Sequence, residues 1–243
     1  MRLIAARLPQ RIADLPALIL AGGLGTRLRS AVPKSQKVVA PVRSRPFLAR
    51  LLDQLSIAGI RHALLLTGHR GDEVERTLGT QHDSVRLEYS RETTPLGTAG
   101  AVRHALKLVT KPTFLLVNGD SYCNVDLQSF FDFHRGRRAD LSMAIAHVND
   151  AGRYGQVHLD TRDRLTSFEE KNPAAEAGWI NTGVYLIQRE LFQNVPKDSP
   201  QSLERDWLPR WTASKTVVGF RCPGPFLDIG TPESYAAAEE FFA

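Results

Sequence analysis

The sequence predicts an α/β fold with a mixed, mostly parallel central sheet that is flanked by helices. Short apolar runs that end in Gly, Asn or Asp alternate with longer amphipathic segments, which is the pattern of strands joined by helical crossovers. The chain has 243 residues, of which 42% are hydrophobic and 23% charged, enough for one large core. It contains no internal repeat, low-complexity tract or flexible linker, so we expect a single domain.

The strands and helices are predicted in order along the chain. The clearest strands are apolar runs at residues 17–20, 63–67, 114–117, 141–146 and 183–187. Two shorter segments, 156–159 and 217–221, are expected to run antiparallel, which makes the sheet mixed. Amphipathic segments predict helices at residues 46–58, 71–78, 100–108, 127–135, 203–211 and 232–242. We divide the chain into an N-terminal extension, residues 1–14, and one domain, residues 15–243.

The bulk composition excludes several classes of protein. Residues 1–14 scatter three arginines among apolar residues and lack the apolar core and cleavage site of a signal peptide. No stretch approaches the ~20 apolar residues that span a bilayer. The two cysteines, Cys123 and Cys222, offer neither a disulfide framework nor a zinc-ligand spacing. We therefore expect a soluble, cytoplasmic protein with reduced thiols and no membrane partner.

The positive charge of the chain is unevenly distributed. The net charge is +5, and residues 15–52 contain no Asp or Glu. The basic residues of this segment are Arg27, Arg29, Lys34, Lys37, Arg43, Arg45 and Arg50. Such a segment is expected to lie near a polyanion, although a solvated basic face is the alternative. A nucleic-acid partner is not expected, because the segment holds only one aromatic residue, Phe47, for stacking on bases.

A glycine-rich loop, A-G-G-L-G-T-R-L at residues 21–28, follows the first predicted strand. Glycines let a backbone approach a ligand closely and turn its N–H groups inward toward an anion. The loop lacks the Gly-Lys-Ser/Thr ending of a P-loop. It also lacks a dinucleotide fingerprint, because Leu28 stands where the third glycine belongs and the first acidic residue after the loop is Asp53. A purely structural turn is the alternative for the loop taken alone.

Two cations accompany this loop. Arg27 carries a guanidinium suited to bidentate phosphate contact, and Lys37 lies before a proline, in K-V-V-A-P. Together, G-G-x-G-T-R-L followed by K-x-x-x-P resembles the signature of the sugar-1-phosphate nucleotidyltransferases. The resemblance implies a single Rossmann-like nucleotide-binding domain that binds a nucleoside triphosphate, a sugar 1-phosphate and Mg²⁺ and releases pyrophosphate. It leaves a homo-oligomer possible.

The lysine motif departs from the usual Pro-Lys-Pro of that family. Lys37 is flanked by Gln36 and Val38, and a second lysine, Lys34, lies just upstream after a proline. We assign the family role to Lys37 because its distance from Pro41 fits the family pattern. Lys34 is the alternative candidate, and its ordinary interpretation is a surface lysine.

Two predicted strand ends carry carboxylates. Asp120 follows the buried run at residues 114–118, and Asp228 begins the motif D-I-G-T-P in a similarly apolar setting. Open α/β sheets present ligands at the carboxyl ends of their strands, and two aspartates there can hold Mg²⁺. An Asp that caps a helix is the alternative for either residue alone. Both motifs are similar to those of the family, which implies that Asp120 and Asp228 are the metal ligands.

A second group of motifs lies between these aspartates. The segment F-E-E-K, which ends at Lys171, and the segment I-N-T-G, which contains Asn181, resemble the F-x-E-K and N-T-G motifs of the family. The resemblance implies that Glu170 binds sugar hydroxyls, that Lys171 binds the sugar phosphate, and that Asn181 and Gly155 complete the sugar pocket. An ordinary exposed Glu-Lys pair is the alternative for Glu170 and Lys171.

The segment R-E-T-T-P-L-G-T-A-G, residues 91–100, is similar to the base-binding loop of the family. Glu92 lies where some relatives place a glutamine that reads the base, and one carboxylate can accept both N1–H and the amino group of guanine. This favours GTP, although a solvated loop residue is the alternative for Glu92. The nucleotide-binding residues implied by the resemblance are Leu20, Ala21, Gly22, Gly23, Gly25, Thr26, Arg27, Glu92, Pro95, Gly97, Thr98 and Asn118.

The expected chemistry needs no general base, because the second pKa of a sugar phosphate lies near 6 and the nucleophile is already an anion. Catalysis then requires in-line positioning and charge cancellation, which we assign to Arg27, Lys37 and Lys171 together with Mg²⁺. Residues 25–33 and the short chain look most like D-glycero-α-D-manno-heptose 1-phosphate guanylyltransferases of surface-polysaccharide synthesis. A mannose 1-phosphate guanylyltransferase, another sugar-1-phosphate nucleotidyltransferase and a non-catalytic sugar-nucleotide sensor are the alternatives.

Overall fold

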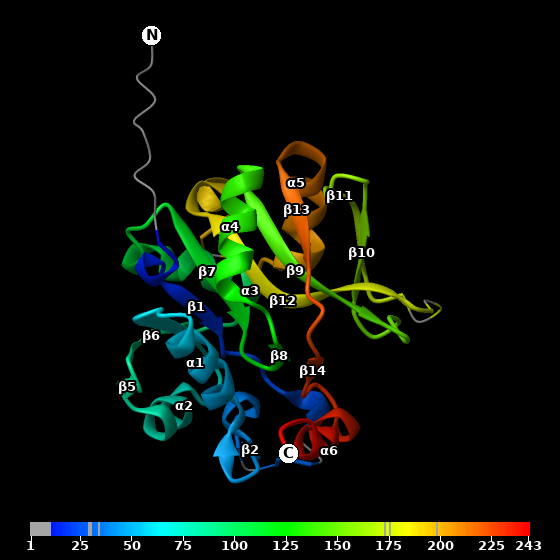
Figure 1. The fold of residues 1–243 in the computed structure, drawn as a ribbon. Helices are drawn as coiled ribbons and strands as arrows, with labels where there is room; N and C mark the ends of the chain where they lie inside the picture. Colours follow the sequence, from blue (N-terminus) through cyan, green and yellow to red (C-terminus); the bar gives the residue numbers. More distant parts are fainter. Residues whose placement is uncertain (1–10, 29–30, 34, 173, 175, 198) are drawn as a thin grey trace.

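The computed structural model describes residues 11–28, 31–33, 35–172, 174, 176–197 and 199–243. Most of the predicted N-terminal extension, and also Arg29 and Lys34, lie outside the described residues. Helices lie against both faces of a central sheet (Figure 1). The predicted α/β fold, with a mixed sheet built around a parallel centre and flanked by helices, is confirmed.

The central sheet has ten strands among the described residues. Eight follow the order β11-β10-β12-β7-β1-β4-β6-β5, and β9 pairs with both β12 and β13. The strands are β1 (Ala17–Leu20), β4 (His62–Thr67), β5 (Gln81–His82), β6 (Val85–Arg91), β7 (Thr113–Asn118), β9 (Leu141–Val148), β10 (Gly155–Leu159), β11 (Leu165–Glu170), β12 (Gly178–Gln188) and β13 (Val217–Arg221). Because β7, β1, β4 and β6 are parallel neighbours, their carboxyl ends meet at one edge of the sheet.

The described residues form six α-helices: α1 (Phe47–Ile57), α2 (Gly71–Leu78), α3 (Gly97–Ala105), α4 (Leu127–Arg137), α5 (Leu208–Ser214) and α6 (Pro232–Phe241). Each corresponds to a predicted helix, but two predictions are wrong in detail. The helix expected at 100–108 begins three residues earlier, as α3, and ends in a short 3-10 turn, η4 (Leu106–Leu108). The helix expected at 203–211 is divided into a π-helical turn, η6 (Leu203–Trp207), and α5.

The predicted direction of residues 217–221 is wrong. The strand β13 runs parallel to β9, not antiparallel. Its parallel direction follows from the connection, because the chain between β9 and β13 returns through α5 to the starting end of β9, as a crossover does. The other strand predicted to be antiparallel, β10, does run antiparallel to β11 and β12.

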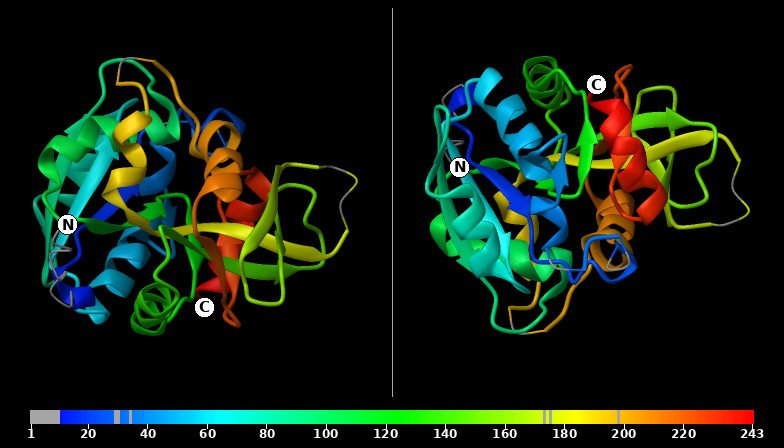
Figure 2. Two further views of the ribbon diagram at one scale, coloured as in Figure 1. Left: turned by 90° about the horizontal axis from the view of Figure 1, so that it is seen from above. Right: turned by 90° about the horizontal axis from the view of Figure 1, so that it is seen from below.

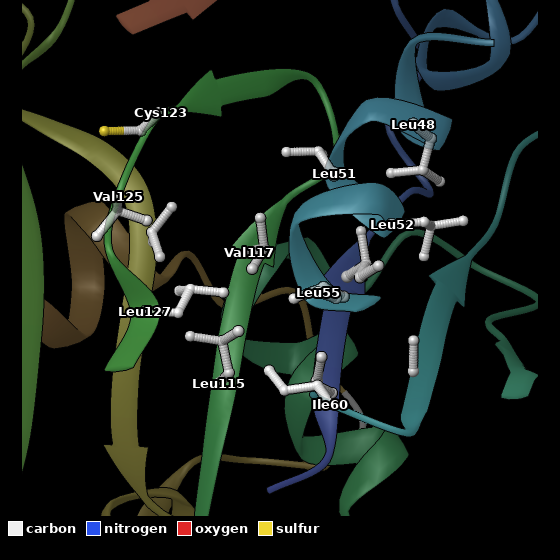
Figure 3. Packing of buried hydrophobic residues seen from close by; sticks show 14 of the residues in the cluster. Leu48, Leu51, Leu52, Leu55, Ile60, Leu115, Val117, Cys123, Val125 and Leu127 are labelled. Atoms are coloured by element: carbon white, nitrogen blue, oxygen red, sulfur yellow. The ribbon is translucent and has the colours of Figure 1, made fainter. Parts of the chain in front are cut away.

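Hydrophobic clusters on the two faces of the sheet fix the helices. In β1, Ala17 and Ile19 point into one cluster and Leu18 into the other. The helix α1 repeats Leu48, Leu51, Leu52 and Leu55 at helical spacing, and these side chains lie over β1 and β7 (Figure 3). Each buried leucine contributes about 1.5–3 kcal/mol to folding. The helix α1 thereby holds β1 and β7 in place, and the carboxyl ends of these two strands contribute to the site.

The sheet extends beyond this core on one side. The strands β10 and β11 and the first half of β12 project from the body of the molecule (Figures 1 and 2). The register of β12 against β9 shifts between Asn181 and Tyr185, where Gly183 has φ of +79°. The shift lets one long strand serve both the parallel centre and the projecting part. No helix among the described residues is long and apolar enough to cross a membrane.

Candidate active site

A cavity of about 860 Å³ opens at the carboxyl ends of β1, β4, β6 and β7. The residues that line it are the last residues of these strands and residues of the segments that follow them, as expected for the ligand crevice of an open α/β sheet. The predicted residues that line the cavity are Leu20, Gly22, Gly23, Lys37, Glu92, Pro95, Gly97, Thr98, Asn118 and Asp120. The fold therefore gathers most of the predicted nucleotide-binding residues around one space.

The glycine loop is held by a residue that sequence reasoning treated only as a departure from the family motif. Gln36 is 2% exposed, and its side-chain amide donates to the backbone oxygens of Ala21 (3.0 Å) and Gly23 (3.1 Å). Its side-chain oxygen accepts from the N–H of Val38 at 2.7 Å. Gln36 thus fixes the loop on one side and the Lys37 turn on the other. In the sequence, the position of Gln36 between the glycine loop and Lys37 was the only indication of this role.

Glu92 lies at the end of β6, beside the ends of β4 and β1. Its Oε2 accepts a hydrogen bond from the N–H of Leu96 at 3.2 Å. A methyl group placed on Gly68 would come 2.8 Å from Oε1, so the glycine makes room for the carboxylate. Burial raises the pKa of Glu92 above its ordinary 4.5, while the Leu96 N–H acts against this shift. The carboxylate is therefore half-buried at the cavity wall rather than on a solvated loop.

The first turn of α3 is joined to the segment that leads into η6. Gly97 has φ of +71°, and a methyl group there would come 2.5 Å from the backbone oxygen of Gln201. The hydroxyl of Thr98 donates to Glu204 Oε2 at 2.7 Å and accepts from the N–H of Leu203 at 2.7 Å. Burial raises the pKa of Glu204. The P-L-G-T turn therefore requires glycine at Gly97, and Glu204 is a site neighbour that the sequence reasoning missed.

Asn118 ends β7 and lines the cavity. Its Oδ1 is buried and has no hydrogen-bond partner within the described part of the chain. Its amide nitrogen lies against Gly183, where a methyl group would come within 2.6 Å of Nδ2. The unpaired acceptor suits a hydroxyl donor from a ligand.

Lys37 and Asp120 form the central ion pair of the site. Lys37 Nζ lies 2.6 Å from Asp120 Oδ2, and the lysine side chain is 11% exposed. Burial alone would raise the pKa of Asp120, but the Lys37 ammonium and several hydrogen bonds hold that pKa below its ordinary value of 3.8. The aspartate is therefore ionised near neutral pH and attracts cations.

Asp228 approaches the same place from the other side. The short strands β8 (Ser121–Cys123) and β14 (Phe226–Asp228) pair so that Ser121 faces Asp228, and the N–H of Ile229 donates to the backbone oxygen of Asp120. Asp228 Oδ1 accepts from the N–H of Gly230 at 2.6 Å. A methyl group on Gly230 would lie 3.7 Å from Lys37 Nζ. The backbone segments that carry the two predicted metal ligands are thus paired, and Lys37 lies beside Asp120 and close to Gly230.

The donor set fits a hard divalent cation. Asp120 and Asp228 offer only oxygen ligands, and the ammonium of Lys37 already occupies the space that one carboxylate faces. A second acidic group, formed by Asp53, His82 and Asp83, lies elsewhere in the described residues. Asp53 there accepts hydrogen bonds from Arg45 and His82. None of these three residues lines the large cavity, whereas Asp120 does.

The predicted sugar-binding residues lie on the projecting part of the sheet. Gly155 faces Glu170 across the β10–β11 pair, and a methyl group on Gly155 would come 2.5 Å from the Phe168 ring. Glu170 Oε1 lies 3.4 Å from Lys171 Nζ. Asn181, on β12, donates from Nδ2 to the Tyr185 hydroxyl at 2.6 Å and accepts from Gly183. Three of the four predicted residues thus lie on adjacent strands, and Lys171 directly follows β11.

Some predicted residues lie apart from the cavity. Arg27 is exposed in a short 3-10 turn, η2 (Thr26–Leu28), and neither Arg27, Thr26 nor Ala21 lines the cavity. A methyl group on Gly25 would lie 3.3 Å from Lys37 Cβ, and Gly25 does not line the cavity either. The basic segment is also divided, because the Arg43 backbone N–H bonds Glu239 and Arg45 pairs with Asp53. Only part of this segment therefore faces the site.

Comparisons with known proteins agree with this geometry. Residues 16–243 match the family model described as Nucleotidyl transferase. The chain is 36% identical over 227 residues to a D-glycero-alpha-D-manno-heptose 1-phosphate guanylyltransferase of Aneurinibacillus thermoaerophilus, covering 93% of this chain and 97% of that protein. It is 32% identical to a mannose-1-phosphate guanylyltransferase of Mycobacterium tuberculosis, of which it spans 63%.

A solved structure, HddC from Yersinia pseudotuberculosis, superposes with a TM-score of 0.84 at 32% identity and covers 94% of this chain and 100% of that one. A second structure of that protein, complexed with GMP-PN, gives the same TM-score at 31% identity. The match of the family model and the identity to relatives that the chain covers almost completely both indicate one family. The chain is a nucleotidyltransferase and belongs to the nucleotidyl transferase family.

Proposed function

We propose that this nucleotidyltransferase transfers GMP from GTP to D-glycero-α-D-manno-heptose 1-phosphate and releases pyrophosphate. The observation that carries the base assignment is Glu92, a half-buried carboxylate on the wall of the large cavity. Guanine presents N1–H and its amino group side by side, and a carboxylate accepts both. Uracil and thymine have no such pair of donors. The guanylyltransferase names of the relatives and the GMP-PN complex support the same base.

The residues around the cavity suit a reaction governed by charge. Lys37 offers an ammonium that pairs with Asp120, one of the two predicted metal ligands, and Lys171 offers a second just after β11. A Mg²⁺ ion held by the two aspartates would offset the charge of the phosphates. The glycine loop, with Arg27 beside it, would receive the departing pyrophosphate. The sugar phosphate attacks as an anion, so no side chain has to remove a proton.

The sugar pocket of this proposal is made by the projecting strands. Glu170 accepts hydrogen bonds from sugar hydroxyls, and Asn181 and the backbone at Gly155 bound the pocket. The heptose assignment is supported by two heptose 1-phosphate guanylyltransferases of which the chain covers 97%. The product would be a precursor of surface polysaccharide made in the cytoplasm.

Mannose 1-phosphate is the second candidate for the sugar, because mannose-1-phosphate guanylyltransferases are also relatives. The chain spans only 63% and 60% of two of these proteins, which weighs toward the heptose. A regulatory sugar-nucleotide sensor is the non-enzymatic candidate. Loss of a cation or carboxylate would mark such a sensor, whereas Lys37, Asp120 and Asp228 are all in place.

A pyrophosphate-release screen tests the proposal. GTP, ATP, UTP and dTTP are each combined with heptose, mannose and glucose 1-phosphates in the presence of Mg²⁺. We expect the highest kcat/KM for GTP with the heptose 1-phosphate. Preference for mannose 1-phosphate would select the second candidate, and absence of release with every pair would favour a sensor.

A further inference from the structure

Each of the two predicted metal ligands already carries a cation of the chain itself. Lys37 Nζ lies 2.6 Å from Asp120 Oδ2, and Arg153 Nη2 lies 3.5 Å from Asp228 Oδ2. The lysine was expected from the sequence, but the arginine was not. A metal ion bound to Asp228 would therefore displace the Arg153 guanidinium, which would then need another partner.

Arg153 is held at the junction of the metal side and the sugar side. It directly precedes Tyr154 and Gly155, the start of β10. Its guanidinium carbon lies 5.6 Å from the centre of the Tyr154 ring, and that ring packs edge-on against Phe226 of β14 at 5.4 Å. The Tyr154 hydroxyl also lies near the Asp228 carboxylate. The arginine therefore lies over the Tyr154 ring, and this ring packs against the strand that carries the predicted metal ligand Asp228.

The Arg153–Asp228 pair is suited to exchange. The arginine side chain is 43% exposed, and an ion pair that open to solvent contributes only about 0–1 kcal/mol. A divalent cation on Asp228 would compete for the same oxygen and repel the guanidinium. A phosphate group that enters beside the metal offers the displaced arginine a better partner, because the planar guanidinium binds phosphate oxygens in pairs.

We propose that Arg153 is a phosphate-binding residue of the active site, which pairs with Asp228 in the metal-free enzyme and moves to the phosphate of the sugar 1-phosphate when the metal binds. This inference rests on the proposed nucleotidyl transfer. The sugar phosphate is the ligand rather than GTP for two reasons. Arg153 adjoins Gly155 of the sugar side, and it is not among the residues that line the nucleotide cavity.

Steady-state kinetics of Arg153→Gln give the first test, with the sugar 1-phosphate that the substrate screen shows to be best. KM for that sugar phosphate should rise about 10- to 100-fold, the range for loss of a charge-assisted hydrogen bond, while KM for GTP stays within about twofold. The matched control is Arg137→Gln, because Arg137 also pairs with an aspartate, Asp163, and lies over an aromatic ring, Phe133. The control should retain wild-type values. An unchanged KM for the sugar phosphate, or a rise confined to GTP, would overturn the proposal.

Binding of Mn²⁺ to the substrate-free protein gives the second test and does not depend on turnover. Titration followed by electron paramagnetic resonance should show a Kd about two- to fivefold lower in Arg153→Gln, because the competing guanidinium is gone. The Arg137→Gln control should match wild type. A purely structural arginine would leave Mn²⁺ binding unchanged or weaken it, and either result would overturn the inference. If nucleotidyl transfer itself fails, this measurement still decides whether Arg153 competes with the metal.

Discussion

Replacement of Glu92 by glutamine tests the assignment of the base at a single atom. Glu92 Oε2 accepts from the Leu96 N–H at 3.2 Å, and the remaining oxygen of a glutamine can keep that bond. The change then falls on the position of Oε1, which lies in the space left by Gly68. An amide group there would point a donor at the donors of guanine. An unpaired polar contact costs about 1–3 kcal/mol, which corresponds to about a 5- to 150-fold rise in KM for GTP.

The loss should appear mainly in KM, because the base is held alike in the ground state and the transition state. The assay is kcat/KM for GTP, UTP, dTTP and ATP in both proteins with one sugar phosphate. Glu88→Gln is the matched control, since Glu88 lies on the same strand and pairs with Arg86 instead of facing the cavity. Wild-type preference for UTP or dTTP would refute the guanine assignment. Unchanged GTP selectivity in Glu92→Gln would remove only the role of Glu92.

Three further predictions concern charge in the site. Asp120→Ala and Asp228→Ala should each abolish turnover, because each removes a proposed metal ligand, and normal activity in either variant would remove that residue from the metal site. Lys37→Ala should lower kcat about 100- to 1000-fold in the same assay, with Lys34→Ala near wild type, and the reverse result would show that the lysine motif was misaligned. KM for GTP should rise as pH falls through the raised pKa of Glu92, because a protonated carboxyl group can no longer accept both hydrogen bonds from guanine. A pH series in which Glu92→Gln shows the same rise would contradict this role of Glu92.

Three strands of the parallel centre, β1, β4 and β7, could be predicted because they are continuous apolar runs. The fourth parallel strand, β6, reads V-R-L-E-Y-S-R, and the antiparallel strand β11 reads L-T-S-F-E-E. In each strand several side chains face solvent, so neither forms an apolar run, and both were missed. The direction of β13 could not be predicted, since the path of the long connection before it sets that direction.

The site could be predicted where a motif joins adjacent positions in sequence, as at Glu170 and Lys171. It could not be predicted where the fold joins distant positions. Gln36 reaches the carbonyl oxygens of the glycine loop, and Glu204 meets Thr98, across 106 positions of sequence, only after the chain is folded. The role of Arg153 could not be predicted for the same reason, because its partner Asp228 lies on a strand far along the chain.

The central claim is tested most directly by competition in one reaction. The protein is given equal concentrations of GTP, ATP, UTP and dTTP together with equal concentrations of D-glycero-α-D-manno-heptose 1-phosphate and mannose 1-phosphate, and the products are identified by mass spectrometry at early times. Because all substrates compete, the product ratio reports relative kcat/KM. We predict that the guanosine diphosphate heptose dominates. A uridine, thymidine or adenosine diphosphate sugar as the main product would contradict the base assignment, and guanosine diphosphate mannose would contradict the sugar.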